Sequence, residues 1–269
     1  MLCNDFSRAD RFYFHNHNKF DEFAEPRPFL HHHDAFEIYF ITAGNCTYFV
    51  DNRCYKMIPG DVIIIPEGVI HNTEYNGNHH LRLLINCSRQ FIPASVISVL
   101  PSIGNLYRNS DIRDELMDIF KKIEEEYTRA DNFSTDILRC YTYMLFFLMA
   151  RNKNQFDKST AGNKYVERAI NYIQNNFSNN ITLSEISEVC SIHPEYFSRM
   201  FKKETGFGFC EYVNTLRLQK AESLLKQHSK MSVTEIAAEC GFDDSNYFSV
   251  KFKKMYGMPP KKMQLQYNK

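Results

Sequence analysis

One sequence pattern occurs twice in the C-terminal part of this 269-residue chain. The first copy reads LSEISEVCSIHPEYFSRMFKKETG over 183–206, and the second reads VTEIAAECGFDDSNYFSVKFKKMYG over 233–257. Each copy has a short amphipathic segment, a tight break, and an aromatic-rich segment that ends in Phe-Lys-Lys and a glycine. This order is typical of a helix-turn-helix, whose second helix enters the DNA major groove. We call the copies the first head and the second head, and we expect them to read two successive segments of one DNA face.

The residues around each break favour helices with defined ends. Pro194 suits the first turn of a helix, where its missing N–H costs nothing. Asp244 suits the N-cap of the second reading helix, and His193 is a poorer cap at the corresponding place in the first. Gly206 and Gly257 are expected to end the two helices in the left-handed conformation. An ordinary helical domain with a solvated lysine face explains one such pattern, whereas two copies in register favour DNA reading.

A long amphipathic run, residues 210–227, lies between the two heads. Its apolar residues recur at helical spacing, so it predicts a connecting helix. A rigid helix there would set the spacing of the heads, ideally at about 34 Å or one turn of DNA.

Residues 164–260 resemble the DNA-binding domain of the AraC/XylS family of transcription regulators. The most specific match lies in the second copy and its tail, at Ile236-Ala237, Gly241-Phe242, Asp244, Tyr247-Phe248-Ser249, Phe252-Lys253-Lys254, Gly257 and Pro259. The chain departs from the family pattern at Asn246, at Val250 and over 262–264, where the family usually has Ser, Arg and an aromatic-Arg ending. Because Asn246 and Val250 lie on or near the predicted reading surface, DNA contacts by the second head are expected to be weaker or different in specificity.

Side chains opposite the expected core positions are candidates for DNA contact. In the first reading helix Phe197, Met200 and Phe201 are expected to face the core. The resemblance then implies base-edge contacts at Glu195, Ser198 and Arg199. A guanidinium at Arg199 can bridge guanine O6 and N7, and Glu195 either accepts from cytosine N4 or stays a solvated carboxylate.

The second reading helix has a less charged outward set, which consists of Ser245, Asn246, Ser249 and Val250. Asn246 can pair with adenine, and Val250 can contact a thymine methyl group. Lysines near the end of both helices are expected to neutralise phosphates without reading sequence, and these are Lys202, Lys203, Lys253 and Lys254.

Charge is divided unevenly along a chain whose overall charge is zero. Residues 164–269 carry 15 Lys and Arg against 11 Asp and Glu, and residues 1–163 carry 17 against 21. The sign of this division fits a DNA-binding C-terminal part. The length predicts two domains, and the polar stretch 152–163 is expected to link them. We therefore predict a sensing domain over 1–151, a linker over 152–163 and a DNA-binding domain over 164–269.

Nothing in the sequence suggests export or a membrane partner. The first five residues, MLCND, offer no apolar signal core. The longest uncharged apolar run, 140–150, is shorter than the roughly 20 residues that span a bilayer. Eight cysteines without a CxxC pair are typical of reduced thiols. We expect a cytoplasmic protein.

The N-terminal part predicts a different fold, so the fold class is α+β with several domains. Short β-rich segments occupy 37–42, 46–50, 62–65 and 81–87, with a hairpin turn at Asp51-Asn52. They favour a small β-barrel or sandwich. Two amphipathic helices, 112–127 and 134–151, follow. They are expected to pack on the barrel, and then either on a second subunit or only within one chain.

Two motifs in the predicted barrel resemble those of cupins. Their residues are His31, His33, Glu37 and Gly44 in the first motif, and Gly60, Pro66, Gly68 and His71 in the second. In metal-binding cupins such motifs supply three His and one Glu to one metal, so the resemblance implies a divalent transition metal of unspecified identity. On a regular strand His31, His33 and Glu37 would share a face. Sensor domains of the AraC/XylS family also keep such residues without metal, where they hydrogen-bond one another or contact an organic effector.

An organic effector is expected inside the barrel. The inward candidates are His31, His33, Glu37, Tyr39 and His71, whereas His32, His79 and His80 are expected at the surface. The many aromatic residues suit a carbohydrate ring, and they equally suit an ordinary core.

The sequence therefore predicts a transcription regulator that binds promoter DNA under the control of a small molecule. RNA polymerase is a further partner if the protein is an activator. The alternative is a metal-dependent cupin, either an oxygenase or isomerase or a metal sensor, fused to DNA-binding heads. Since no second general acid or base stands out beside the four ligand-type residues, we expect no enzymatic activity.

Overall fold

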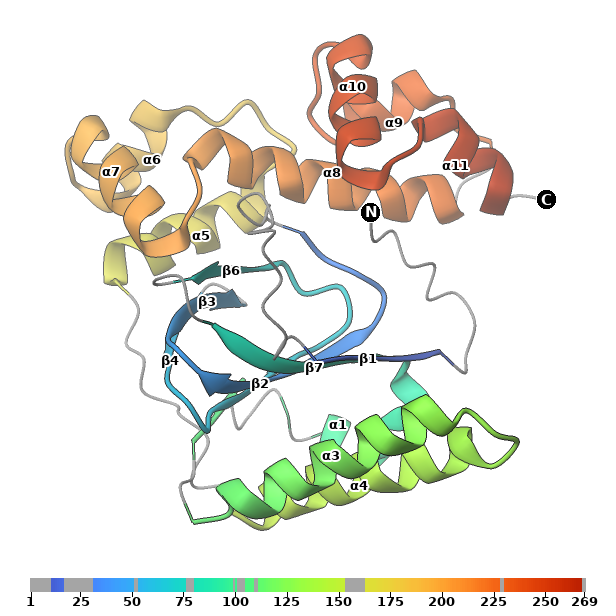
Figure 1. The fold of residues 1–269 in the computed structure, drawn as a ribbon. Coiled ribbons are helices and arrows are strands. Elements are labelled where there is room, and N and C mark those ends of the chain that lie inside the picture. The colour runs from blue at the N-terminus through green and yellow to red at the C-terminus, as the bar shows by residue number, and fades with distance from the viewer. Residues whose placement is uncertain are drawn as a thin grey trace. The chain divides into compact units, whose positions relative to one another are not determined.

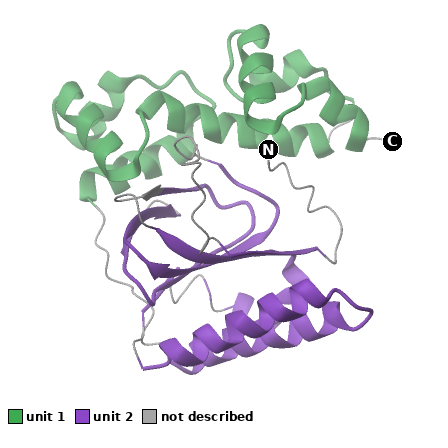
Figure 2. Cartoon of the chain, viewed as in Figure 1, with its two compact units in different colours: residues 1–3, 161–269 green, residues 4–160 purple. Residues whose placement is uncertain are grey.

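The structure is a computed structural model that describes residues 11–16, 31–50, 53–75, 80–98, 100, 105–108, 111–152, 163–227 and 230–267, with only the backbone at 74 and 75. The chain forms two compact units, one holding the described residues up to Asn152 and the other those from Asn163 (Figure 2). Most of the predicted linker lies outside the described residues, so the predicted domain bounds stay a prediction. No helix in the described part has the length and apolar character needed to cross a membrane.

Two antiparallel sheets build the N-terminal unit (Figure 1). The larger has the strand order β1-β7-β2-β5-β8, and the smaller has the order β4-β3-β6. The strands are β1 (Phe12–Asn16), β2 (Phe36–Ala43), β3 (Cys46–Val50), β4 (Arg53–Met57), β5 (Val62–Ile65), β6 (His71–Tyr75), β7 (Leu81–Cys87) and β8 (Leu106–Tyr107). The strands predicted over 46–50, 62–65 and 81–87 are confirmed, and the one predicted over 37–42 is one residue longer at each end. The predicted Asp51-Asn52 turn lies outside the described residues, and Val50 pairs with Arg53 across it.

Side chains of β2 alternate between two cores, as successive residues of a strand must. Phe36, Ile38 and Phe40 join a cluster with the helices of this unit. Tyr39 and Ile41 join a second cluster, which draws on both sheets and fills the space between them. Both faces of the larger sheet are thus covered, which explains why β5 is apolar throughout. The predicted cupin-like β-barrel is confirmed.

Helices α3 (Arg113–Arg129) and α4 (Ser134–Arg151) pack side by side on the outer face of the larger sheet (Figure 1). Phe120 of α3 stacks on Phe40 of β2, with ring centroids 5.1 Å apart. A short 3-10 helix, η1 (Arg89–Phe91), and α1 (Ala94–Ile97) lie between β7 and these helices along the chain. The two predicted packing helices are confirmed.

In the part of the C-terminal unit that the structure describes, every regular element is a helix, and turns and loops join the helices (Figure 1). Its helices are α5 (Lys164–Asn176), α6 (Leu183–Cys190), α7 (Pro194–Thr205), α8 (Phe209–Gln227), α9 (Val233–Glu239), α10 (Ser245–Tyr256) and α11 (Pro260–Tyr267). The first head is α6 and α7, the second head is α9 and α10, and α8 is the predicted connecting helix. The two helix-turn-helix motifs joined by a long helix are therefore confirmed.

The helix ends follow the sequence. Pro194 is the first residue of α7, and His193 before it makes no side-chain cap. Asp244 caps α10, because its Oδ1 accepts from the amides of Asn246 at 2.7 Å and Tyr247 at 3.3 Å. Gly206 and Gly257 end the reading helices with φ of 81° and 73°.

The sequence analysis missed a further duplicated signal. Both supporting helices begin with a capping box, Thr182 with Glu185 and Ser232 with Glu235. In each box the hydroxyl accepts from the glutamate amide while the carboxylate accepts from the amide of the capping residue. The duplication therefore extends from the apolar core to the helix caps.

Candidate functional site

The reading helix of the first head presents a polar face opposite its buried side. Phe197, Met200 and Phe201 are buried, as predicted. Glu195 and Arg199 are exposed, and Ser198 is half-buried beside them. The helix begins at Pro194, so Glu195 and Ser198 stand in its first turns, the part of a reading helix that approaches base edges. The structure thus brings the predicted contact residues of this head onto one accessible face.

The reading helix of the second head presents a more neutral face. Asn246 is exposed, and Val250 keeps 67% of its surface accessible although it is apolar. Ser245 and Ser249 are half-buried, and the Ser249 hydroxyl donates to the Ser245 carbonyl at 2.9 Å. An exposed β-branched side chain on a helix gains nothing from packing within the unit. Val250 is therefore free to contact a methyl group of a binding partner.

Lysines occupy the last turn of both reading helices. Lys202, Lys203, Lys253 and Lys254 are all exposed. A positive charge at a helix C-terminus also interacts favourably with the helix dipole, which stabilises the helix by about 0.3–1 kcal/mol. These lysines therefore have a local role in addition to the predicted neutralisation of phosphates.

A pair of tyrosines is the feature of the reading faces that the sequence analysis missed. Tyr196 and Tyr247 stand at matching positions and are 53% and 45% exposed. The Tyr247 hydroxyl accepts from Asn214 Nδ2 at 3.4 Å, and Lys251 Nζ lies 5.1 Å from the centre of its ring. The signal was present, since the sequence Tyr-Phe-Ser occurs in both copies, with the phenylalanine buried and the tyrosine outside.

A histidine cluster lies at the barrel, formed by His31, His33 and His71. One ligand-type nitrogen from each lies within 4.8 Å of the others. Backbone pairing holds the two segments together: the amide of His31 donates to the carbonyl of His71 at 3.2 Å, and the reverse bond is 3.0 Å. The ring centroid of His71 is 4.3 Å from that of His31 and 4.9 Å from that of His33.

Strand alternation does not bring these histidines and Glu37 together, so that prediction was wrong. A regular strand from His31 to Glu37 was expected, whereas β2 begins at Phe36 after a bend at Asp34-Ala35. His33 instead reaches Glu37 because the chain bends, with its Nδ1 on the Ala35 carbonyl at 3.0 Å. His31 is positioned by its pairing with His71 rather than by strand alternation.

Glu37 is the buried acceptor of the cluster. Its Oε2 lies 3.2 Å from His33 Nε2, and its Oε1 accepts from the Tyr48 hydroxyl at 2.8 Å. Burial raises the pKa of Glu37, but the hydrogen bond from His33 and the nearby imidazole charges outweigh burial and hold the pKa well below its ordinary value. Burial lowers the pKa of His33, yet the bond to Glu37 leaves it raised. The contact at 3.2 Å therefore holds the His33 ring against the Glu37 carboxyl group.

His71 differs from His33, because burial and the charge of His31 move its pKa well below the ordinary value. Its Nδ1 donates to the Val69 carbonyl at 2.8 Å, so a neutral ring carries its lone pair on Nε2. That atom is buried without a hydrogen-bond partner, 3.8 Å from Glu37 Oε2. A neutral imidazole anchored through Nδ1 is the usual arrangement of a metal ligand. The residues present therefore fit a transition metal.

Tyr39 lies deeper in the barrel and is fully buried. Its ring packs edge-on against Tyr48 at 4.8 Å, and its hydroxyl contacts the ring of His80. The expectation that His80 lies at the surface was therefore wrong for its imidazole. His79 lies outside the described residues, and His32 is half-buried.

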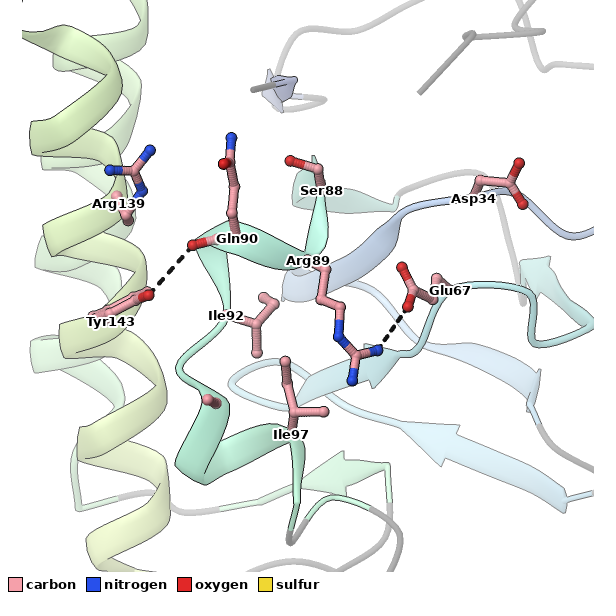
Figure 3. Close-up of a pocket in the computed structure, with 10 residues that line it drawn as sticks. Asp34, Glu67, Ser88, Arg89, Gln90, Ile92, Ile97, Arg139 and Tyr143 are labelled. Carbon is pink, nitrogen blue, oxygen red and sulfur yellow. Dashed lines mark hydrogen bonds and ion pairs between the residues drawn. The ribbon is translucent and has the colours of Figure 1, made fainter. Parts of the chain in front are cut away.

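A groove of about 840 Å³ lies beside the barrel (Figure 3). It is lined by Asp34, Glu67, Ser88, Arg89, Gln90, Ile92, Ala94, Ile97, Arg139 and Tyr143. Arg89 pairs with Glu67 at 2.7 Å along one side, and the Tyr143 hydroxyl of α4 donates to the Gln90 carbonyl at 3.3 Å on the other. Its residues come from separate elements of the chain, so no local pattern in the sequence could have predicted it.

The two units match two family models. An AraC-like ligand binding domain matches residues 21–139, and a helix-turn-helix domain matches residues 186–266. The transcriptional activator RhaS of Escherichia coli is 25% identical over 241 residues, which cover 86% of this chain and 85% of RhaS. Among solved structures, ToxT from Vibrio cholerae has 16% identity and a TM-score of 0.41 over 96% of this chain and 97% of its own.

A further solved structure, the C-terminal domain of AraT, a response regulator from Geobacillus stearothermophilus, is 35% identical, with a TM-score of 0.38 over 40% of this chain and 88% of that domain. The matched models together span most of both units, the sensing barrel and the tandem reading heads. The chain therefore belongs to the AraC family and is an effector-controlled, DNA-binding transcription regulator.

Proposed function

We propose that the two heads read promoter DNA with the residues predicted from the sequence, and that a small molecule bound to the N-terminal unit changes this binding. The observation that carries the proposal is the matched pair of exposed faces on α7 and α10, each opposite a buried aromatic side. Arg199 and Asn246 are the base-reading side chains on these faces, and the four lysines at the helix ends contact phosphates.

The test is a selection of binding sites from random double-stranded DNA, followed by affinity measurements at several salt concentrations. Each phosphate contact contributes about −0.9 to the slope of log affinity against log salt. The proposal predicts a selected site with two readable segments and a slope that becomes shallower by about 1 for each lysine changed to Met. A selected site without sequence preference, or an affinity independent of salt, would contradict it.

The effector has two candidate positions in the N-terminal unit. One is the barrel end formed by His31, His33, Glu37, Tyr39 and His71, whose buried polar atoms can orient a small organic ligand such as a carbohydrate. The other is the groove beside α4, whose wall includes Arg139 and Tyr143. The two adjoin along the chain, since Asp34 of the groove follows His33. Occupation of either acts on DNA binding only if the ligand binds one conformation more tightly than the other.

A second copy of the chain is the proposed partner of α4. This helix keeps Met144 and Phe147 exposed by 53% and 44%, although its opposite side is buried against the sheet. A homodimer would cover them. If the regulator activates transcription, RNA polymerase is a further partner. We place the protein in the cytoplasm, because promoter DNA lies there, and we assign it no enzymatic activity.

A metal sensor is the second candidate function, favoured by the three clustered imidazole nitrogens and the unpartnered Nε2 of His71. His31, His33 and His71, with Glu37, would hold the ion, which would draw these segments together. Metal content measured by mass spectrometry on protein purified without chelator tests this. About one equivalent in the wild type and in an exposed-histidine control, His193→Ala, with none in His71→Ala, supports a metal site. No metal in any sample after reconstitution leaves the organic effector.

A further inference from the structure

Helix α8 belongs to the cores of both heads. Near its start Phe209 and Tyr212 contact the first reading helix, with ring centroids 6.3 Å from Phe197 and 5.7 Å from Phe201. Toward its end Leu218, Ala221, Leu224 and Leu225 join the core of the second head. A connection by one helix alone permits bending and twisting between the heads at the middle of that helix.

Arg217 lies at this midpoint and makes contacts toward both heads. Its Nε donates to the Phe177 carbonyl at 2.7 Å, and its terminal nitrogen donates to the Asn179 carbonyl at 2.9 Å. These carbonyls lie in the loop between α5 and α6, directly before the first head. The guanidinium also lies over the ring of Phe242, 5.8 Å from its centre, in the turn of the second head. A lysine has one charged centre and could not make all three contacts.

Gly241 provides a second contact between the same two segments. It sits in the turn of the second head with φ of +84°, and a Cβ on it would lie 2.5 Å from the Ser178 carbonyl oxygen. The backbone of the second turn therefore presses directly on the α5–α6 loop. Ser191, which follows Cys190 in the first head as Gly241 follows Cys240 in the second, is also left-handed with φ of 57° but carries a side chain. The glycine is thus required by the contact with Ser178 as well as by the backbone conformation.

We infer that Arg217 and Gly241, together with the 177–179 loop, form an inter-head lock that fixes the spacing and rotation of the two heads. The heads are then joined twice, once through α8 and once through the lock, and two connections suppress the bending that one would allow. The lock makes spacing between the two DNA segments a determinant of specificity, positioned by residues that touch no DNA. This inference rests on the proposed DNA reading by both heads.

The experiment uses the full chain and the site selected with the wild-type protein, in which the two read segments are located by footprinting. Two base pairs are then inserted between the segments. The insertion turns the second segment by about 70° and moves it by about 7 Å along the axis. For the wild type we expect at least about 30-fold weaker binding, because one locked head loses its base contacts.

Two variants open the lock, each with a matched control. Arg217→Met removes the donors but keeps the aliphatic length, and Lys220→Met removes an exposed charge from the same helix. Gly241→Ala adds the obstructing Cβ, and Gly257→Ala adds one at φ of +73° with no atom within 4 Å. The lock variants should lose about 3- to 10-fold on the original site, and their penalty for the insertion should fall below about 5-fold. Both controls should keep the wild-type penalty.

The outcomes separate the inference from the proposed function. If the wild type selects no DNA sequence, DNA reading by the heads fails. If it selects two segments but tolerates the insertion, or if both lock variants keep the full penalty, the heads bind as proposed and the lock is wrong. Thermal unfolding of each variant identifies one that does not fold, and the other variant then decides.

Discussion

The two heads share helix caps and a buried core, and they differ in the side chains on their outward faces. Both begin with a capping box, bury two phenylalanines of the reading helix and end in a left-handed glycine. On the outward side, Arg199 of the first head corresponds to Val250 of the second, and Glu195 corresponds to Asn246. Packing constrains the inner side of a duplicated helix, whereas only the bound DNA constrains the outer side. The second head is therefore a similar fold with a different reading face.

The turns differ for a separate reason. The second head has one more residue between matching positions, because Cys240 lies seven positions before Tyr247 whereas Cys190 lies six positions before Tyr196. In this longer turn the Asp244 side chain caps α10, and Gly241 closely approaches Ser178 in the α5–α6 loop. The second turn thus serves helix capping and inter-head contact together, whereas the first turn serves neither through its side chains.

The largest expected effect tests whether the cores of the two heads are packed alike. Phe197→Ala and Phe248→Ala each remove a fully buried ring. Each should lower the free energy of unfolding of its head by about 3–5 kcal/mol, because the transfer energy is lost and a cavity remains. Denaturant unfolding of the full chain, followed by circular dichroism, measures both. A loss below about 1 kcal/mol for either would show that the two cores are not packed alike.

A smaller effect tests whether the reading faces differ. Arg199→Ala should weaken binding to the selected site by about 1–3 kcal/mol and relax preference at one base position, since a bidentate contact to guanine is lost. Val250→Ala removes only methyl contacts and should weaken binding less than about 5-fold. Competition with single-base variants of the site measures both changes. Equal losses, or an unchanged base preference in Arg199→Ala, would remove the assigned asymmetry.

The sequence predicted the helices and strands in which apolar residues follow a regular pattern. Both heads, α8 and the strands β3, β5 and β7 could be placed because apolar residues recur at 3.6 or 2 positions or run continuously between turn residues. The strands β4, with the sequence RCYKM, and β6, with HNTEY, were missed because their polar residues hide the pattern. Tertiary pairing with β3, rather than local preference, makes them strands.

The sites show the same limit. The histidine cluster could be named from motif spacing, but its geometry depends on the pairing of His31 with His71, which is 40 positions away along the chain. The groove beside α4 and the contact of Gly241 with Ser178 were not predictable, because each joins segments without a shared pattern. Spacing in a sequence identifies residue types suited to a chemistry, and long-range contacts decide which of them meet.

The smallest expected effect concerns the N-caps of the two reading helices. Asp244→Ala should destabilise the second head by about 1 kcal/mol, because its carboxylate accepts from two amides that would otherwise lack partners. His193→Ala should change the stability of the first head by less than about 0.5 kcal/mol, since His193 makes no side-chain cap. Thermal unfolding of the full chain measures both.

The reciprocal substitution completes the test. His193→Asp places a carboxylate at the N-cap of α7, where Pro194 lacks an amide but the following amides remain available. A gain of about 0.5–1 kcal/mol is expected, because the N-cap backbone is already extended, with ψ of 140°. A gain in stability accompanied by weaker DNA binding would show that the uncapped N-terminus of α7 contacts the negatively charged phosphate backbone of the DNA. A gain without any change in binding would instead make the missing cap a neutral difference between the heads.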